Sequence, residues 1–326
     1  MAKNMFITMG LLLLSALSLF ATAQKEEVWP DPEKTITVVV PFAAGGGTDL
    51  IFRTIVEEMK KASPANIIVS NIGGAGSATG TNEMLNFPAD GYSILASGTH
   101  TVAATLQGLT IGYKELEGLA GLNWDPFIIA VHKDKPWQTM KELIEQAKKN
   151  PGKLSLGNAG TGGATGVASI GLDLALGKVF NVTPFSGGVD LLASMLGGHV
   201  DAGIYSQSEI LSNKDKLRPL VVLYHQRSTL PGLNEVPTMK EAGLGDIIIP
   251  GGSFRSLSVK KGTPEPVKKK LAEIVRQAFN SPAFQSYMKA NGLLPAYYEL
   301  KDLDAYFEEL IKSYVPILKE AGLLKS

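Results

Sequence analysis

Residues 36–49 read ITVVVPFAAGGGTD, and this stretch decides the fold class. Its β-branched run, residues 36–40, predicts a buried strand. Gly45, Gly46 and Gly47 follow as a loop, and Thr48 begins a helix that we expect to reach about Lys61. A strand, a glycine loop and a helix in this order are typical of a parallel-type α/β sheet.

The same unit recurs along the chain. Further strands are predicted at residues 67–70, 93–97, 154–156, 179–183, 200–205 and 217–223, and further glycine loops at 73–77, 157–163 and 186–188. Because the units fall into two groups, we expect two α/β lobes, with strands at 127–132 and 254–259 crossing between them. Ligands of such sheets bind beyond the carboxyl ends of the strands, so we expect a ligand cleft between the lobes.

The first 23 residues have the pattern of a secretory signal. Lys3 precedes an apolar stretch at 9–20, and Ala21-Thr22-Ala23 offers the small residues of a cleavage site. The alternative is an uncleaved membrane anchor, but the apolar run is short against the roughly 20 residues that span a bilayer. We therefore predict an exported, periplasmic protein that is cleaved near Ala23. The chain has no cysteine, which excludes a lipid anchor, disulfides and a thiol nucleophile.

The overall charge argues against nucleic acid as a partner. The 326 residues include 31 basic and 31 acidic side chains, so the chain has no net positive charge to attract phosphates. The glycine loops match neither the dinucleotide fingerprint nor the phosphate loop with its Gly-Lys-Ser/Thr ending. We accordingly expect no cofactor, no metal and no nucleic acid.

The glycine loops are suited to hold an anion. Free backbone N–H groups and the positive ends of helix dipoles meet there, without any lysine or arginine in the loops themselves. Glycines also serve simple turning, so each loop alone is weak evidence. Four loops at strand ends together predict a small anionic ligand that is held by backbone and hydroxyl donors.

Several charged or titratable residues have two interpretations. Asp49 could accept a bond from the ligand or only stabilise the start of its helix. His100 could touch the ligand or pack within a loop, and Arg255 could bind the anion or form a salt bridge between the lobes. The four histidines have no metal-ligand spacing, and no serine sits in a nucleophile-elbow pattern, so we predict no catalytic residues.

The sequence resembles the substrate receptors of tripartite tricarboxylate transporters, the Bug-type receptors. Besides residues 36–49, the resemblance rests on NIGGAGSATG at 71–80, PADGYSILASGTH at 88–100, NPGKLSLGNAGTGGATG at 150–166, PFSGGVDLLASMLGGHVDAG at 184–203, EVPTMKEAGL at 235–244 and FRSLSVKKGTP at 254–264. It implies a type II periplasmic binding fold with one lobe from residues 24–125 plus 253–326 and a second from 126–252. It also implies a monomer that captures a small carboxylate and delivers it to a large and a small membrane permease subunit.

The resemblance places the ligand site on residues of both lobes. The implied contacts are Phe42, Ala44, Gly45, Gly46, Gly47, Thr48, Asp49, Gly98, Thr99, His100, Asn158, Ala159, Gly160, Thr161, Gly162, Gly163, Thr165, Phe185, Ser186, Gly187, Tyr205 and Ser206.

The chain departs from the family where Phe185-Ser186 replaces a frequent Tyr-Lys pair, and it lacks a frequent histidine near Gly166 and a frequent tryptophan at the position of Phe254. A smaller and less cationic second lobe favours a mono- or dicarboxylate over citrate. The alternatives are a ligand-sensing input protein for a membrane sensor kinase and, less favoured, a secreted α/β hydrolase.

Overall fold

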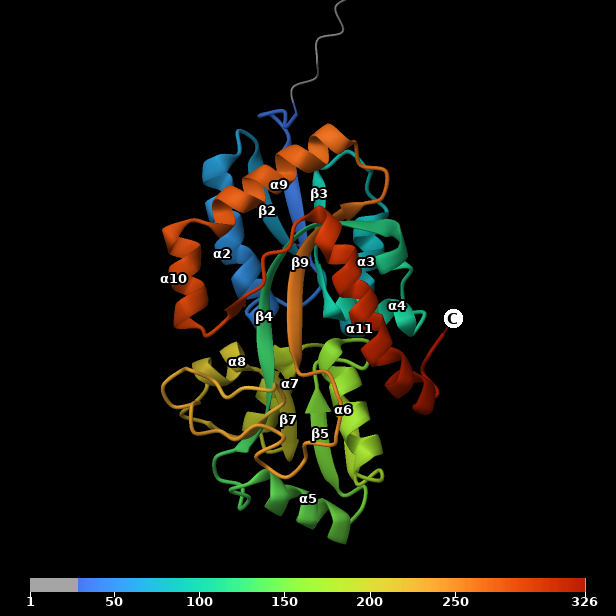
Figure 1. Ribbon diagram of the computed structural model, residues 1–326, viewed down its shortest axis with the longest axis vertical. Coiled ribbons are helices and arrows are strands. Elements are labelled where there is room, and N and C mark those ends of the chain that lie inside the picture. Colours follow the sequence, from blue (N-terminus) through green and yellow to red (C-terminus); the bar gives the residue numbers. More distant parts are fainter. Residues whose placement is uncertain (1–28, 326) are drawn as a thin grey trace, which may run out of the picture.

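Two long strands, β4 (Leu116–His132) and β9 (Gly252–Lys260), join the two lobes of the protein (Figure 1). The computed structural model describes residues 29–325, except for the side chains of residues 300, 301 and 304. The predicted secretory signal, residues 1–23, lies outside the described residues. No helix in the described range combines the length and apolar composition needed to cross a membrane.

A continuous path of paired strands runs through both lobes. Its order is β2-β1-β3-β9-β4-β7-β5-β6, and β8 and β10 pair with β4 outside this path. The remaining strands are β1 (Thr35–Val40), β2 (Asn66–Asn71), β3 (Ser93–Gly98), β5 (Leu154–Asn158), β6 (Phe180–Pro184), β7 (Ala202–Ser206), β8 (Leu217–Val222) and β10 (Leu294–Pro295). β4 pairs with β9 as far as Pro126, opposite Gly252, and from Phe127 onward it pairs with β7 and β8.

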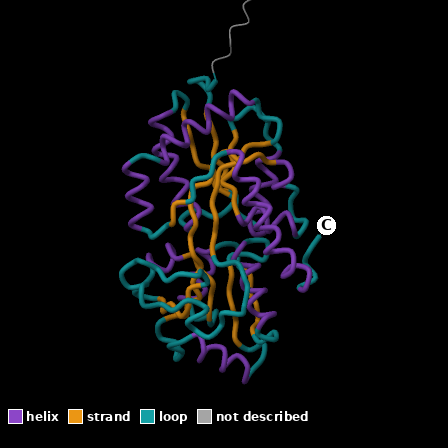
Figure 2. The backbone as a smooth tube through the Cα atoms, in the orientation of Figure 1, coloured by secondary structure: helices purple, strands orange, loops and turns teal. Residues whose placement is uncertain are grey.

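Helices cover both faces of the first lobe's sheet (Figure 2). They are α2 (Gly47–Ala62), α3 (Ala78–Leu85), α4 (Thr99–Leu106), α9 (Glu265–Phe279), α10 (Pro282–Ala290) and α11 (Leu300–Glu320), with short 3-10 turns at Ala75–Ser77 and Gly112–Glu115. Ile36 and Val38 of β1 pack with α2 and α9 on one face, while Val39 packs with α3 on the other. This alternation explains why the β1 sequence is apolar throughout.

The second lobe repeats this arrangement with α5 (Met140–Lys149), α6 (Ala164–Ala175), α7 (Gly188–Leu196) and α8 (Gln207–Ser212). α5 and α6 share a core with Leu156 of β5 and Ile204 of β7, and α7 packs on the opposite face against Tyr205. The C-terminal helix α11 contacts both lobes, since it packs against β4 and also against α6. The predicted two-lobed α/β fold is thus confirmed, with longer crossing strands than the sequence suggested.

Candidate functional site

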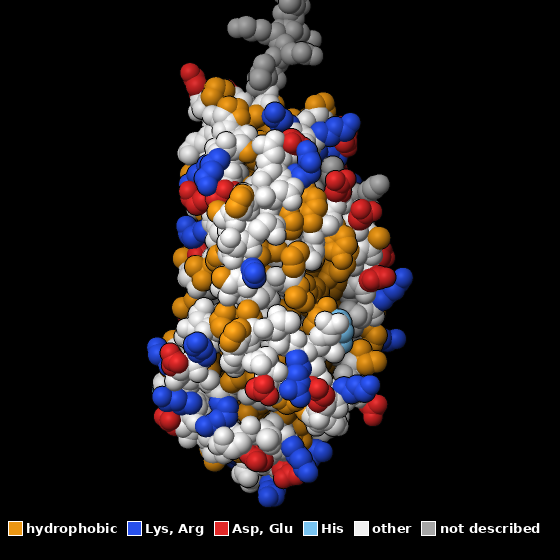
Figure 3. All heavy atoms as spheres, turned by 60° about the vertical axis from the view of Figure 1, so that its left-hand side comes forward, with side chains coloured by type: hydrophobic (Ala, Val, Ile, Leu, Met, Phe, Trp, Pro, Cys, Tyr) orange, Lys and Arg blue, Asp and Glu red, His pale blue; other side chains and the backbone are white. Residues whose placement is uncertain are grey.

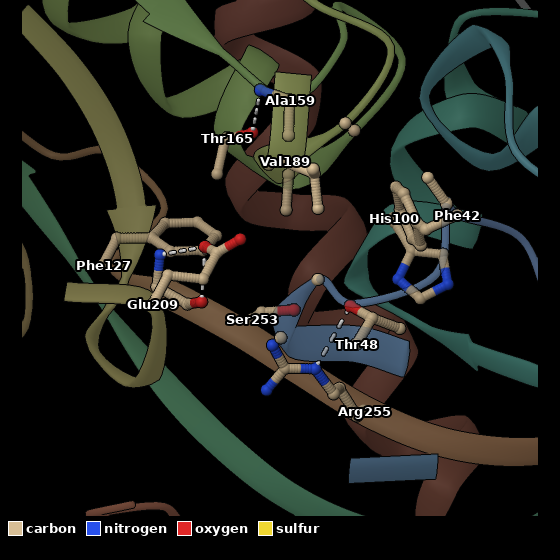
Figure 4. A pocket seen from close by; sticks show the side chains of 18 residues that line it. Phe42, Thr48, His100, Phe127, Ala159, Thr165, Val189, Glu209, Ser253 and Arg255 are labelled. Atoms are coloured by element: carbon tan, nitrogen blue, oxygen red, sulfur yellow. Dashed lines mark hydrogen bonds between the residues drawn. The ribbon is translucent and has the colours of Figure 1, made fainter. Parts of the chain in front are cut away.

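A cavity of about 70 Å³ lies between the two lobes, where the N-terminal turns of α2, α6 and α7 converge (Figure 4). Its lining residues are Phe42, Ala43, Gly46, Gly47, Thr48, His100, Phe127, Ala159, Gly163, Ala164, Thr165, Gly187, Gly188, Val189, Ser206, Glu209, Ser253 and Arg255. A buried water needs roughly 10–15 Å³ of such space. The cavity therefore has room for a small molecule.

The first-lobe wall begins with the loop before α2, which Asp49 holds in place. The Asp49 carboxylate accepts bonds from the Gly45 N–H, the Asn71 amide and Arg53 at 2.8, 2.8 and 2.9 Å. Burial alone would raise the pKa of Asp49, but these bonds outweigh burial and lower it. Asp49 is therefore an ionised residue that organises the loop, while the neighbouring Gly46, Gly47 and Thr48 reach the cavity.

His100 and Phe42 close the cavity on the first-lobe side. Their rings meet edge to face with centroids 5.0 Å apart, and His100 Nε2 lies 3.0 Å from the Ala96 carbonyl oxygen. Burial lowers the pKa of His100 to about 4, since a charged ring would lose its hydration there. At neutral pH the ring is uncharged and its Nε2–H donates to Ala96.

Arg255 supplies the cation that the loops lack. Its side chain is 2% exposed, and Nη1 donates to the fully buried Asp125 of β4 at 3.0 Å. Nε donates to Thr48 Oγ1 at 3.4 Å, whereas Nη2 makes no hydrogen bond to the described part of the chain. A salt bridge of Arg255 is present, although it links the paired crossing strands β4 and β9 and not one lobe to the other, and Nη2 remains available to a ligand.

The second-lobe wall consists of the loops before α6 and α7. Thr165 Oγ1 accepts from the Ala159 N–H at 3.0 Å, and Asn158 Oδ1 accepts from the Gly160 N–H at 3.0 Å. These bonds fold residues 158–165 into a loop whose backbone borders the cavity. Gly187 and Gly188 begin α7 and bring its free N–H groups to the same space.

Glu209 adds an acidic group that the sequence analysis did not single out. Its Oε2 accepts from the Ser206 N–H at 2.9 Å and from Ser206 Oγ at 2.7 Å, forming a capping box at the start of α8. A Cβ atom placed on Gly188 would lie only 2.0 Å from Oε1, so the carboxylate lies directly against the start of α7. The Ser-x-x-Glu spacing at 206–209 was a readable signal for this helix start.

The lobes also touch beside the cavity. A Cβ atom on Gly76 of the first lobe would lie 2.5 Å from the carbonyl carbon of Gly162 in the second. Gln107 Nε2 donates to the Thr161 carbonyl oxygen across the same contact at 3.0 Å. Only glycine allows these backbones to meet so closely, so the two lobes are in direct contact beside the cavity.

Comparison with known proteins places the chain in a family. The model of the tripartite tricarboxylate transporter family receptor matches residues 51–323. The chain belongs to this receptor family. The structure of the periplasmic binding protein BugD has 30% identity and a TM-score of 0.84, over 91% of this chain and 100% of that chain.

Two further relatives support the assignment. MatC from Rhodopseudomonas palustris, a structure with bound malate, has 25% identity and a TM-score of 0.79 over 87% of this chain and 98% of its own. BugT from Bordetella pertussis is 26% identical over 298 residues, which are 89% of this chain and 90% of BugT. The resemblance found in the sequence is thereby confirmed: the chain is a periplasmic-type solute receptor and not an enzyme.

In this receptor the structure brings ten of the predicted contact residues to the cavity. They are Phe42, Gly46, Gly47, Thr48, His100, Ala159, Gly163, Thr165, Gly187 and Ser206. Gly45 and Tyr205 line a second hollow that adjoins it. Within residues 29–325, no group of three or more His, Asp or Glu side chains is arranged to hold a metal ion.

The other predicted residues do not line the cavity. Gly98 and Thr99 pack against the Phe254 carbonyl of β9, and Asn158 is buried and bonded to Ser169. Ala44, Gly160, Thr161 and Gly162 lie in the loops but outside the lining, as do Phe185 and the exposed Ser186. The lining also includes Arg255, which had two interpretations, and Glu209, Ala43, Phe127, Ala164, Gly188, Val189 and Ser253, which were not among the named contacts.

Proposed function

We propose that the protein is an exported receptor that captures a small mono- or dicarboxylate between its lobes and delivers it to a tripartite membrane transporter. One observation carries the proposal: the first turns of α2, α6 and α7 converge on one small cavity from two lobes. Unpaired N–H groups and dipole ends favour an anion at such a place.

The charge at the cavity favours a small acid over citrate. Arg255 is the single lysine or arginine among the lining residues, and it already pairs with Asp125. A tricarboxylate would bring three negative charges to a site with little compensation. The related MatC, with bound malate, is consistent with a smaller acid. The face in Figure 3 carries basic and acidic side chains interspersed over both lobes, which fits a partner recognised by shape more than by bulk charge.

Capture works through closure. Contacts from both lobes exist together only when the lobes meet, so the ligand stabilises the closed state that the Gly76–Gly162 contact represents. The large and small permease subunits would then receive the ligand from the closed receptor. Export through a signal cleaved near Ala23, and a monomeric state, complete the proposal.

A titration against matched acids and amides tests this function. The mature protein is mixed with propionate, succinate, malate, aspartate and citrate, and with propionamide and succinamide as uncharged controls. At 100 times its dissociation constant a ligand should add roughly 2.7 kcal/mol to the free energy of unfolding. We expect at least one mono- or dicarboxylate to raise the melting temperature and neither amide to do so. Equal shifts with the amides, or no shift with any acid, would contradict the proposal.

A further inference from the structure

The cavity contains an acidic side chain without a cationic partner. Arg255 is neutralised by Asp125 at 3.0 Å, and the buried His100 is uncharged at neutral pH because its pKa is lowered to about 4. Glu209 forms no ion pair with any lysine, arginine or histidine in the described residues. Arg255, Asp125 and Glu209 together therefore carry a surplus of one negative charge at the cavity, which is unexpected for a receptor of acids.

The geometry leaves one oxygen of Glu209 free for a ligand. Both bonds from Ser206 go to Oε2, at 2.9 and 2.7 Å, and no hydrogen bond from within residues 29–325 reaches Oε1. Figure 4 shows the carboxylate at one side of the cavity and facing into it, below Val189, with Thr48 and Arg255 across the open space. Donors for an anion and a free acceptor thus lie on different sides of one small cavity.

We infer that Glu209 is a specificity residue, which selects a carboxylate that also carries a protonated amine. This inference rests on the proposed function and narrows its ligand class. The ligand's carboxylate would lie at the start of α2, within reach of Arg255 Nη2, and its ammonium would donate to Glu209 Oε1. An ammonium there completes an ion pair inside a closed cleft, where such pairs are strong.

The same geometry disfavours a second carboxylate at this position. Two carboxylates that share a dry site repel, and one of them must take up a proton. A diacid without an amine would therefore have to enter with an extra proton or leave its second carboxylate away from Glu209. Proton uptake is measurable and gives the inference a second readout.

Two ligand series and two variants test the inference. The series are propionate, lactate and alanine, and succinate, malate and aspartate, which differ only by hydrogen, hydroxyl or ammonium at the second carbon. Glu209→Gln removes the charge but keeps an oxygen that can accept from Ser206. The matched control is Glu142→Gln, because Glu142 also accepts a backbone bond at the start of a helix, from the Gln138 N–H at 2.7 Å, and α5 contributes nothing to the cavity.

We expect the wild-type protein and Glu142→Gln to bind the amine member of at least one series roughly tenfold tighter than the unsubstituted acid. Glu209→Gln should lose most of this preference while its melting temperature stays close to that of the control. Calorimetric titration in two buffers of different ionisation enthalpy should show no proton uptake on binding the amine ligand.

Three results would overturn the inference. One is equal affinity of the wild-type protein for amine and unsubstituted acids, and another is an unchanged preference in Glu209→Gln. The third is tight binding of a plain diacid with uptake of one proton, since Glu209 would then act as a protonated donor to a carboxylate. In all three cases carboxylates still bind, so the proposed function stands. If the wild-type protein and both variants bind no acid of the two series, the proposed function fails as well.

Discussion

Replacing Arg255 separates the structural role of this residue from its role in binding. Arg255→Met keeps the length and apolar stem of the side chain but leaves Asp125, which is fully buried, without its cation. Losing one partner of a buried pair costs about 3–5 kcal/mol of unfolding free energy. Asp125 retains its bonds from Ser208 Oγ and Ser208 N–H at 2.6 and 3.3 Å, so we expect the lower end, about 3 kcal/mol.

A second change on the partner should restore stability. In Arg255→Met with Asp125→Asn no buried charge remains, and the asparagine oxygen can still accept from Ser208. Replacing both members of a buried pair is often close to neutral, so the double variant should regain most of the lost 3 kcal/mol, or about 2 kcal/mol. Urea unfolding of the wild type, both single variants and the double variant gives this coupling energy directly.

Binding should not recover in the double variant. A hydrogen bond from a charged donor contributes about 1.5–3 kcal/mol, so its loss lowers affinity by roughly 10- to 150-fold. Isothermal titration with the tightest-binding acid measures this loss in a protein of normal stability. Wild-type affinity in the double variant would refute contact between Arg255 and the ligand. A single variant as stable as the wild type would refute the buried ion pair.

Two further predictions concern closure and pH. Gly76→Ala places a Cβ 2.5 Å from Gly162, so it should keep the lobes apart, increase the radius of gyration in X-ray scattering and weaken binding roughly tenfold. The control Gly177→Ala has a similar positive φ of 88° but no atom within 4 Å, and should leave both readouts unchanged; equal effects of the two would refute the contact. Burial lowers the pKa of His100 to about 4 in the folded protein, against 6.5 in the unfolded chain. The contribution of the neutral ring to the free energy of unfolding is therefore complete above pH 6.5 and is lost as the pH falls to 4. The loss is of order 3 kcal/mol and should vanish in His100→Gln, which urea unfolding at several pH values measures; parallel curves for both proteins would contradict it.

The sequence predicted the parts of the fold that depend on local patterns. The β-branched run of β1 and the glycines after it are adjacent in the chain, and both are needed for the same strand–loop–helix unit. Because parallel strands align their carboxyl ends, the loops at Gly46, Gly163 and Gly187 could be assigned to one cleft without knowing how the lobes meet. The reach of β4 across the lobes was not predictable in this way, since its first half is rich in small residues and gains its pairing only from β9.

Side-chain direction limited the prediction of the site itself. Asp49 and Asn158 stand in loops that line the cavity, yet both turn away from it to bond their own loop backbone. Sequence position identifies which loop approaches a ligand, but the loop's internal hydrogen bonds decide which of its side chains reach it. Phe185-Ser186 illustrates the same limit, because the departure from the family pattern lies outside the cavity lining and gives no direct reason for specificity.

Glu209 escaped prediction, and Arg255 was left with two interpretations, for a different reason that bears on how the receptor would work. Neither lies in a glycine loop: Arg255 is on a crossing strand, and Glu209 caps a helix of the second lobe. Through Asp125, Arg255 is linked to Ser208 of the second lobe, and through Nε to Thr48 of the first. A ligand bound to Nη2 would therefore engage a network that already spans both lobes. The loops would then supply donors that any small acid can use, whereas the two charged side chains near the crossing strands would determine which acid stabilises closure.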